Sequence, residues 1–361
     1  MTDSPDRNKV ILGLSGGVDS TAAALFLKEN GYKVTGAYLD VTGNNETGGN
    51  MALEIAKQLD IDLISLDVSR EFNSTVISKF CGDYMSGRTP NPCIICNPDI
   101  KFKNLLKAAD EQGAFFIATG HYAAVIYDGG EGRYFVGKAA NRKKDQSYML
   151  YRLGQDALSR SIFPLGEFSS KEAVREYVSG KGIKNSDLKD SQEICFLPRG
   201  ARYTEYLESR GFNGEKGDFL DVNNNVIGVH NGIFNYTVGQ RKNLGMTFGK
   251  PMFVVKIDAE NNSVTLGGGE DLFSASVVSK SNFFSGADCG EIPESYDGLS
   301  VCAKVRYASV PAEAVISRLD ENTVRTVFKT PQRAATPGQS IVFYDGAKVI
   351  GGGVISSCSK T

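Results

Sequence analysis

The chain has 361 residues, of which 41% are hydrophobic and 23% charged, and this composition is typical of a folded protein with two or three domains. Its net charge of −2 excludes an argument for nucleic-acid binding from overall charge, so such binding must depend on local clusters. Two histidines exclude a histidine-rich metal centre. No apolar run approaches the ~18 residues of a membrane span, and the first residues carry no apolar signal segment, so we expect a cytoplasmic protein with no membrane partner and reduced cysteines.

The first stretch that points to chemistry is Leu12 to Ser20, which reads Leu-Gly-Leu-Ser-Gly-Gly-Val-Asp-Ser. We expect a short buried strand at residues 9–14 and a helix at 19–30. The loop between them would lie at the amino end of the helix, where unpaired N–H groups and the macrodipole favour an anion. Gly16 and Gly17 would let the backbone approach phosphate groups closely. The spacing is neither that of a Walker A loop nor that of a dinucleotide-binding loop, and an ordinary glycine-rich turn stays open.

Strands and helices then alternate as far as residue 122. We expect strands at 32–39, 61–68 and 114–119, and helices at 50–59 and 101–112. This alternation predicts right-handed crossovers and an α/β fold with a doubly wound parallel sheet, whose ligand lies outside the carboxyl ends of the strands. The glycine loop, Leu39 and Gly120-His121 all fall at that edge. His121 is also consistent with a satisfied polar residue at a strand end.

Residues 88–98 read Arg-Thr-Pro-Asn-Pro-Cys-Ile-Ile-Cys-Asn-Pro, and their three prolines predict a stiff loop without a helix. Cys93 and Cys96 form a Cys-x-x-Cys motif. Without a second such motif, a redox pair, half of a zinc site, iron–sulfur ligands and buried structural thiols all stay open. Lys101 and Lys103 follow shortly, and nearby cations favour the thiolate form.

A second irregular segment, residues 137–146, carries cations suited to phosphates, although such clusters are usually solvated loops. These cations are Lys138, Arg142, Lys143 and Lys144. A helix is expected at 171–181. Cys195 lies in a short Ile-Cys-Phe run, where a buried inert thiol is the default interpretation.

Beyond about residue 200, short alternating runs such as 253–257 and 263–266 predict small β domains. A further break is expected near residues 270–275. The predicted domains are therefore a catalytic α/β domain at 1–200, a central β-rich domain at 201–272 and a β-barrel at 273–361.

Together these motifs resemble the bacterial tRNA-specific 2-thiouridylases, a family of pyrophosphatase-loop ATP enzymes. The resemblance covers nearly the whole chain and implies an adenine nucleotide alpha hydrolase-like first domain. It is carried by eight motifs in the family's order: Ser15–Ser20, Gly87–Pro92 with Cys96–Asn97, Ala118–Tyr122, Lys144–Tyr148, Ser191–Phe196, Tyr236–Arg241, Lys304–Tyr307 and Arg333–Gln339.

The family's reaction is ATP-dependent 2-thiolation of the wobble uridine, position 34 of tRNA. The resemblance implies ATP and Mg²⁺ as cofactors, and tRNA and a persulfide sulfur-carrier protein as partners. Cys195 would carry the persulfide and Cys96 would attack it, which allows a transient Cys96–Cys195 disulfide.

The resemblance also implies binding residues. For ATP these are Gly13, Leu14, Ser15, Gly16, Gly17, Val18, Asp19, Ser20, Leu39 and Gly120. For the target base they are Asn91, Pro92 and Cys93, and for the rest of the tRNA His121, Lys144, Asp145, Gln146, Arg306, Tyr307 and Gln339.

One position departs from the family pattern. Many relatives read Asn-Pro-Asp-x-x-Cys where this chain has Asn-Pro-Cys-Ile-Ile-Cys, so Cys93 occupies the place of an acid/base carboxylate, and Asp99 is a nearby substitute. The segment after Leu39 also lacks the family's longer insertion. Three alternatives stay open: an iron–sulfur thiolase with Cys93, Cys96 and Cys195 as ligands, a small-molecule adenylating synthetase, and a non-catalytic RNA-binding protein.

Overall fold

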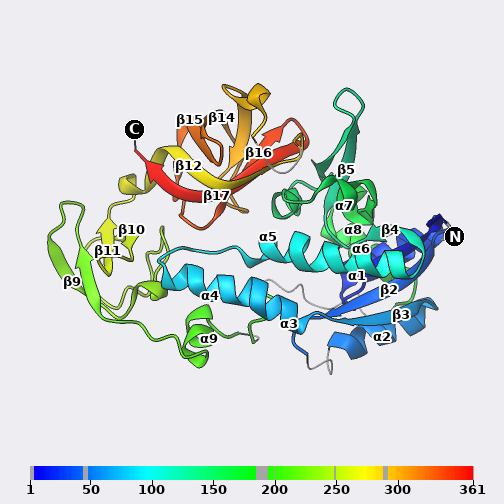
Figure 1. Ribbon diagram of the computed structural model, residues 1–361. Coiled ribbons are helices and arrows are strands. Elements are labelled where there is room, and N and C mark those ends of the chain that lie inside the picture. The colour runs from blue at the N-terminus through cyan, green and yellow to red at the C-terminus, as the bar shows by residue number, and fades with distance from the viewer. Residues whose placement is uncertain are drawn as a thin grey trace. The chain divides into compact units, whose positions relative to one another are not determined.

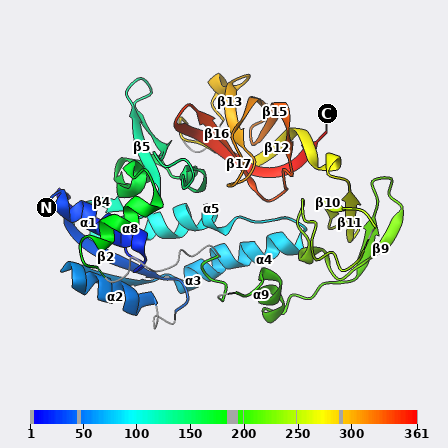
Figure 2. The ribbon, with the colours of Figure 1, turned by 180° about the vertical axis from the view of Figure 1, so that it is seen from behind.

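The computed structural model describes residues 4–43, 48–183, 194–198, 200–247, 249–287 and 292–360. Contacts divide the chain into two compact units. The first unit contains the chain up to Val76, Cys93–Phe196 and Gly346–Ile350, and the second contains Ile77–Pro92, Leu197–Asp345 and the chain from Gly351 onward. Figures 1 and 2 show the elements of both units from opposite sides. The division into 1–200, 201–272 and 273–361 stays a prediction, because the units group residues by contact and not by chain order.

The first unit is built on a five-stranded parallel sheet in the order β3-β2-β1-β4-β7. Its strands are β1 (Asp6–Gly13), β2 (Lys33–Asp40), β3 (Asp62–Asp67), β4 (Ala114–Ala118) and β7 (Ser161–Ile162). The chain builds outward from β1 to β3 and then adds β4 on the other side of β1. The predicted doubly wound parallel sheet is therefore confirmed, with its topological switch point between β1 and β4.

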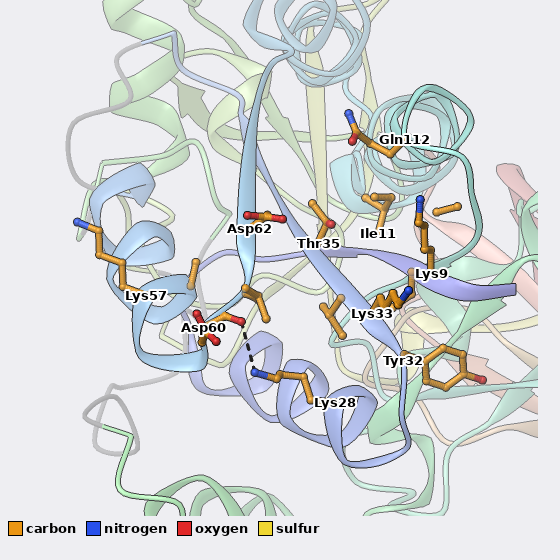
Figure 3. Close-up of a pocket in the computed structure, with 15 residues that line it drawn as sticks. Lys9, Ile11, Lys28, Tyr32, Lys33, Thr35, Lys57, Asp60, Asp62 and Gln112 are labelled. Atoms are coloured by element: carbon orange, nitrogen blue, oxygen red, sulfur yellow. Dashed lines mark hydrogen bonds between the residues drawn. The ribbon is translucent and has the colours of Figure 1, made fainter. Parts of the chain in front are cut away.

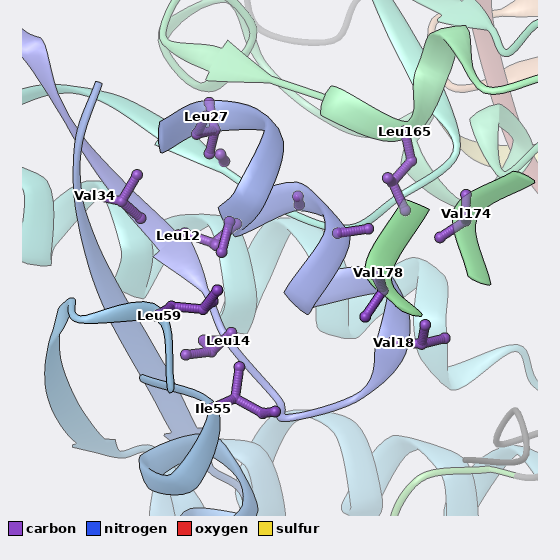
Figure 4. Close-up of a cluster of buried hydrophobic side chains, with 14 of the residues drawn as sticks. Leu12, Leu14, Val18, Leu27, Val34, Ile55, Leu59, Leu165, Val174 and Val178 are labelled. Carbon is purple, nitrogen blue, oxygen red and sulfur yellow. The ribbon is translucent and has the colours of Figure 1, made fainter. Parts of the chain in front are cut away.

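Helices cover both faces of this sheet. One face shares a hydrophobic core with α1 (Val18–Glu29), α2 (Gly48–Leu59) and α8 (Lys171–Ser179). Val10 and Leu12 of β1 belong to this core, and Figure 4 shows Leu12 within it. Gly13 faces the other way, since a Cβ on it would lie 3.5 Å from Leu105 of α6 (Lys103–Glu111). Alternate residues of a strand point to opposite faces, so α6 covers the second face.

The prediction that residues 88–98 contain no helix was wrong. Helix α5 (Pro92–Cys96) continues through a π-helical turn, η2 (Asn97–Phe102), directly into α6. Pro92 is the first residue of α5, where its missing N–H would have no partner in any case. Pro98 falls in the first turn of the π segment, and the wider turn accommodates it.

Shorter elements complete the first unit. They are α3 (Ser69–Phe72), η1 (Asn73–Ile77), β5 (Ala123–Asp128), β6 (Arg133–Lys138), η3 (Ser147–Leu150), α7 (Gln155–Ser159) and η4 (Pro164–Glu167). Strands β5 and β6 form a hairpin, and β6 pairs with the first residues of β17 (Lys348–Ser359). Lys348 anchors this hairpin through a 2.8 Å ion pair with Asp128.

The second unit contains a small mixed sheet in the order β10-β11-β8-β9. Its elements, with the neighbouring helices, are α4 (Ser78–Met85), α9 (Tyr203–Ser209), β8 (Gly217–Leu220), β9 (Val226–His230), η5 (Ile233–Asn235), β10 (Phe253–Asp258) and β11 (Ser263–Gly267). A small core that includes Phe219, Val254 and Leu266 holds this sheet together.

The rest of the second unit is a closed antiparallel barrel. Strands run in the order β12-β15-β14-β13-β16-β17, and a β12–β17 pairing closes the ring. Its elements before β17 are η6 (Glu270–Leu272), β12 (Phe273–Phe284), η7 (Glu294–Tyr296), β13 (Ser300–Lys304), β14 (Ala312–Asp320), β15 (Thr323–Arg333) and β16 (Ser340–Asp345). The predicted β modules, the last a barrel, are therefore confirmed. Among the described residues, no helix has the length and apolarity needed to cross a bilayer.

Candidate functional site

The glycine loop joins the carboxyl end of β1 to the amino end of α1, beside the switch point. The Gly17 carbonyl accepts hydrogen bonds from the Ser20 hydroxyl at 2.9 Å and from the Thr21 amide at 3.1 Å. Gly17 is the residue that caps α1, and it has no side chain to pair with the first helical N–H groups. The amino end of α1 therefore offers backbone donors and the positive end of the helix dipole to an anion.

Neighbouring segments pack so tightly on this loop that only glycine fits at two positions. Gly16 has a φ of +79°, and a Cβ on it would lie 2.8 Å from the main-chain carbonyl carbon of Met51. A Cβ on Gly120, in the turn after β4, would lie 2.9 Å from the carbonyl carbon of Asp19. The turn after β4 therefore contacts the glycine loop. Leu39, the remaining predicted nucleotide contact, is half-buried at the end of β2.

Asp19 of the loop is held by two residues that sequence reasoning did not assign to the site. The Lys171 ammonium lies 2.6 and 2.7 Å from the two carboxylate oxygens, and the Tyr122 hydroxyl donates to Oδ1 at 2.7 Å. The Lys171 side chain is only 8% exposed. Lys171 is the first residue of α8, where a positive charge is unfavourable beside the positive end of the helix dipole. A lysine at this position is the sequence signal that could have identified Lys171 as a site residue.

The structure brings the thiols of Cys93, Cys96 and Cys195 into one neighbourhood of the first unit. All three are free, and Cys96 is buried while Cys195 reaches the surface. Burial raises the pKa of Cys96 to about 12, and the positive charge of Lys101 opposes part of this effect. The protein around Cys195 likewise raises the pKa of its thiol, and Lys101 again acts in the opposite direction. The charges of Cys93 and Cys195 also act on Cys96, which requires the three thiols to be near one another.

Asp99, the candidate substitute for the missing carboxylate, lies one turn beyond the cysteines. Its Oδ2 is 3.5 Å from Nη1 of Arg152, and both side chains are about one third exposed. The carboxylate is therefore already engaged with a cation. Within the residues that the structure describes, no group of three His, Cys, Asp or Glu side chains is arranged to hold a metal ion.

His121 lies beside the thiols, since Lys101 acts on its charge too. Burial, and secondarily Lys101, lowers the pKa of His121 to about 3, so the ring is neutral at pH 7. Its Nδ1 is 2.8 Å from the Thr119 hydroxyl, and its ring stacks on Phe102 at 6.1 Å between centroids. The His121 ring therefore has a hydrogen-bond partner and also lies near the candidate site.

The predicted basic loop is folded back on the turn that carries Tyr122. The Tyr122 amide donates to Oε1 of Gln146 at 2.9 Å, and the Gln146 amide donates to the Tyr122 carbonyl at 2.8 Å. Asp145 is buried and accepts hydrogen bonds from the Ala139 amide at 2.9 Å and from the Ser147 hydroxyl at 2.7 Å. Asp145 therefore shapes the loop, while the half-buried Lys144 lies on it.

Five of the predicted base and tRNA contacts belong to the second unit, namely Asn91, Pro92, Arg306, Tyr307 and Gln339. Gln339 donates from Nε2 to the carbonyls of Thr89 at 3.0 Å and Pro90 at 3.2 Å. The neighbouring Gly338 has a φ of +91°, and a Cβ on it would lie 2.8 Å from the Thr89 amide nitrogen. Within this unit the structure therefore ties Gln339 to the segment that leads into Asn91-Pro92.

An open groove of about 830 Å³ in the first unit lies away from this site. Lys33 and Asp62, the first residues of β2 and β3, line it together with Lys9 of the first half of β1, as Figure 3 shows. The glycine loop and Gly120 follow the opposite ends of the strands. The groove is therefore at the amino edge of the sheet and takes no part in the candidate site.

A parallel sheet with this switch point and a glycine loop at its carboxyl edge define a nucleotide-binding α/β domain, here followed by β modules. The model of the tRNA methyl transferase HUP domain matches residues 8–199. That of the tRNA methyl transferase PRC-barrel domain matches residues 205–268, and that of the aminomethyltransferase beta-barrel domain matches 288–355. The chain belongs to the tRNA-specific 2-thiouridylase family, as the resemblance predicted.

Curated relatives match along nearly the whole chain. The tRNA-specific 2-thiouridylase MnmA of Acetivibrio thermocellus is 42% identical over 97% of this chain and 99% of its own length. Those of Clostridioides difficile and Carboxydothermus hydrogenoformans are each 42% identical over 97% of this chain and 98% of their own length.

Proposed function

We propose that this chain is a tRNA-uridine 2-sulfurtransferase that converts the wobble uridine of tRNA, position 34, to 2-thiouridine with ATP. The observation that carries the proposal is the grouping of Cys96 and Cys195, far apart in sequence, in the unit that also carries the glycine loop. Full-length relatives with this activity in their names support it. All cysteines among the described residues are free thiols, and this fits a reducing compartment such as the cytoplasm.

ATP would activate the uridine. The C2 carbonyl oxygen is a poor leaving group, and transfer of adenylate to it releases pyrophosphate and leaves AMP as the group to be displaced. The backbone of Gly13–Ser20 would hold the phosphates, with Leu39 and Gly120 at the adenosine. The close packing at Gly16 and Gly120 supports this, because it fixes the backbone of the loop against α2 and against the turn after β4. Both oxygens of Asp19, the carboxylate of this loop, are paired with Lys171, so Mg²⁺ would be held mainly by the phosphate oxygens of ATP.

Two thiols would then complete the exchange. The terminal sulfur of a Cys195 persulfide attacks C2, and the C2–O bond breaks to release AMP. The Cys96 thiolate next attacks Sγ of Cys195, which breaks the bond to the transferred sulfur and leaves it as the C2 thiocarbonyl. The product is a Cys96–Cys195 disulfide, which an external thiol must reduce before the next turnover. A persulfide-carrying protein would reload Cys195.

The remaining site residues would hold the tRNA. The target uridine must leave its stack, at a cost of a few kcal/mol, and Asn91, Pro92 and Cys93 would contact it. The other contacts would come from His121, Lys144, Asp145, Gln146, Arg306, Tyr307 and Gln339. A neutral His121 offers hydrogen bonding and stacking rather than charge, since its pKa is about 3.

The test is incubation of the protein with ATP, magnesium, a persulfide-carrying sulfur donor, a thiol that reduces the disulfide and bulk tRNA, followed by mass analysis of the nucleosides. We expect 2-thiouridine to form only when ATP is present. Cys96→Ser and Cys195→Ser should each abolish thiolation and leave tRNA binding nearly unchanged, while Cys302→Ser, on a barrel strand, serves as the matched control. Full activity in either of the first two variants would remove the two-thiol mechanism.

Cys93 motivates one competing mechanism, an iron–sulfur cluster on Cys93, Cys96 and Cys195 that binds sulfide at an open iron. Anaerobic purification with iron and sulfide analysis and visible absorbance separates the two mechanisms. A colourless, iron-free protein that thiolates tRNA excludes the cluster. A brown protein whose activity follows its iron content excludes the persulfide.

A further inference from the structure

Lys101 lies on the same helical run as two of the site cysteines, and a π turn brings it to their side. In a regular α-helix, a residue five positions after Cys96 would be rotated away from it by about 140°. The segment between them is the π-helical turn η2, in which the backbone bonds join residues i and i+5. In such a turn, residues five positions apart, such as Cys96 and Lys101, lie on the same side of the helix. Cys93 is one α-helical turn before Cys96 and shares its side.

Lys101 differs from the other lysine of this segment in its partners. Lys103 is well exposed and forms an ion pair with Glu71. Lys101 is partly buried and, within the part of the chain that the structure describes, makes no hydrogen bond and no ion pair with a carboxylate. Its charge acts instead on Cys96, Cys93 and Cys195. A cation partly withdrawn from water is stabilised by neighbouring groups that can become anionic, and among the described residues these three sulfurs are such groups for Lys101.

Among the residues that the structure describes, the other charged and titratable groups around the cluster do not replace this cation. Asp99 acts on Cys96 but already pairs with Arg152. His121, on the turn after β4, is neutral at pH 7 because burial and Lys101 lower its pKa to about 3. In the described part of the chain, Lys101 is therefore the cation that acts on both Cys96 and Cys195.

We propose that Lys101 is a positioning residue that stabilises the anionic sulfurs of the site, the thiolate of Cys96 and the thiolate or persulfide anion of Cys195. Its use in sulfur transfer rests on the proposed function, while its effect on the sulfurs does not. The thiolate is the nucleophile in both disulfide and sulfur exchange. Lys101 thus provides positive charge beside the buried Cys96 and the exposed Cys195, on a helix with no carboxylate at position 93, and this charge favours the anionic, reactive form of both sulfurs.

The experiment measures the rate of Cys195 alkylation by iodoacetamide from pH 6 to 10 in the full-length protein, with the modified peptide quantified by mass spectrometry. Lys101→Met should lower the rate at pH 8 about tenfold and give an apparent pKa higher by about one. Lys101→Arg, which restores the charge, should recover most of the rate. Lys103→Met is the matched control and should leave the profile unchanged.

An unchanged Cys195 profile in Lys101→Met would overturn the inference, as would failure of Lys101→Arg to recover the rate. Circular dichroism checks folding, and Lys101→Gln replaces the Met variant if that variant does not fold. The two proposals fail separately. A shifted profile in a protein that does not thiolate tRNA removes only the proposed function, and an unshifted profile in an active protein removes only the role of Lys101.

Discussion

Replacing Gly16 by alanine tests whether the glycine loop is shaped by its packing against α2. Gly16 has a φ of +79°, a backbone conformation that alanine adopts at a cost of about 1–2 kcal/mol. The added Cβ would also lie 2.8 Å from both the carbonyl carbon and the Cβ of Met51, and 2.9 Å from the Ala52 nitrogen. Because two of these contacts are backbone atoms, rotation of a side chain does not relieve them.

Overpacking of this kind costs about 1–3 kcal/mol, and with the cost of the positive φ we expect Gly16→Ala to lower the free energy of unfolding by about 2–5 kcal/mol. The loop must also move away from α2, so the affinity for ATP should fall at least tenfold. Urea denaturation measures the first quantity, and equilibrium binding of a fluorescent ATP analogue measures the second.

Gly154→Ala is the control, because Gly154 has a φ of −79° and a Cβ there meets nothing within 4 Å. It should change stability by less than 1 kcal/mol and leave nucleotide binding intact. A Gly16→Ala protein within about 0.5 kcal/mol of the parent, with unchanged ATP affinity, would refute the packing that the structure assigns to this loop.

Three further predictions concern charged groups. In a double-mutant cycle, Lys171→Met and Asp19→Asn should show a coupling of about 1–3 kcal/mol in urea unfolding, and additive effects would contradict the ion pair. Because the pKa of His121 is about 3 when folded and near 6.5 when unfolded, its contribution to stability is complete above pH 6.5 and is lost as the pH falls toward 3. His121→Asn should therefore lose less stability than the parent between pH 7 and pH 5, by up to about 1.4 kcal/mol per pH unit, and parallel losses would contradict the assignment. Neutralising Lys143 and Lys144 together should weaken the binding of all tRNAs and flatten its salt dependence, whereas an unchanged slope would make the loop a solvated surface.

The helix of the 92–111 segment shows where pattern reasoning failed. Three prolines predict a loop, yet Pro92 occupies the first position of α5 and Pro98 falls in the π turn. Proline excludes only the interior of a regular helix. The same π turn sets the register of Lys101 relative to Cys96, so the feature that the sequence concealed is also one on which the proposed role of Lys101 depends.

The sequence by itself determined the parallel sheet, the glycine loop at its carboxyl edge, the β modules and the family. Each of these depends on local periodicity, on residues with special backbone freedom or on motifs in a fixed order. Only the tertiary structure decided which groups meet: Asp19 with Lys171, 152 positions later, and Lys101 with the thiols of two separate segments. A pattern along the chain specifies which face or edge a residue occupies, but pairing between distant segments depends on how the packed elements bring those edges together.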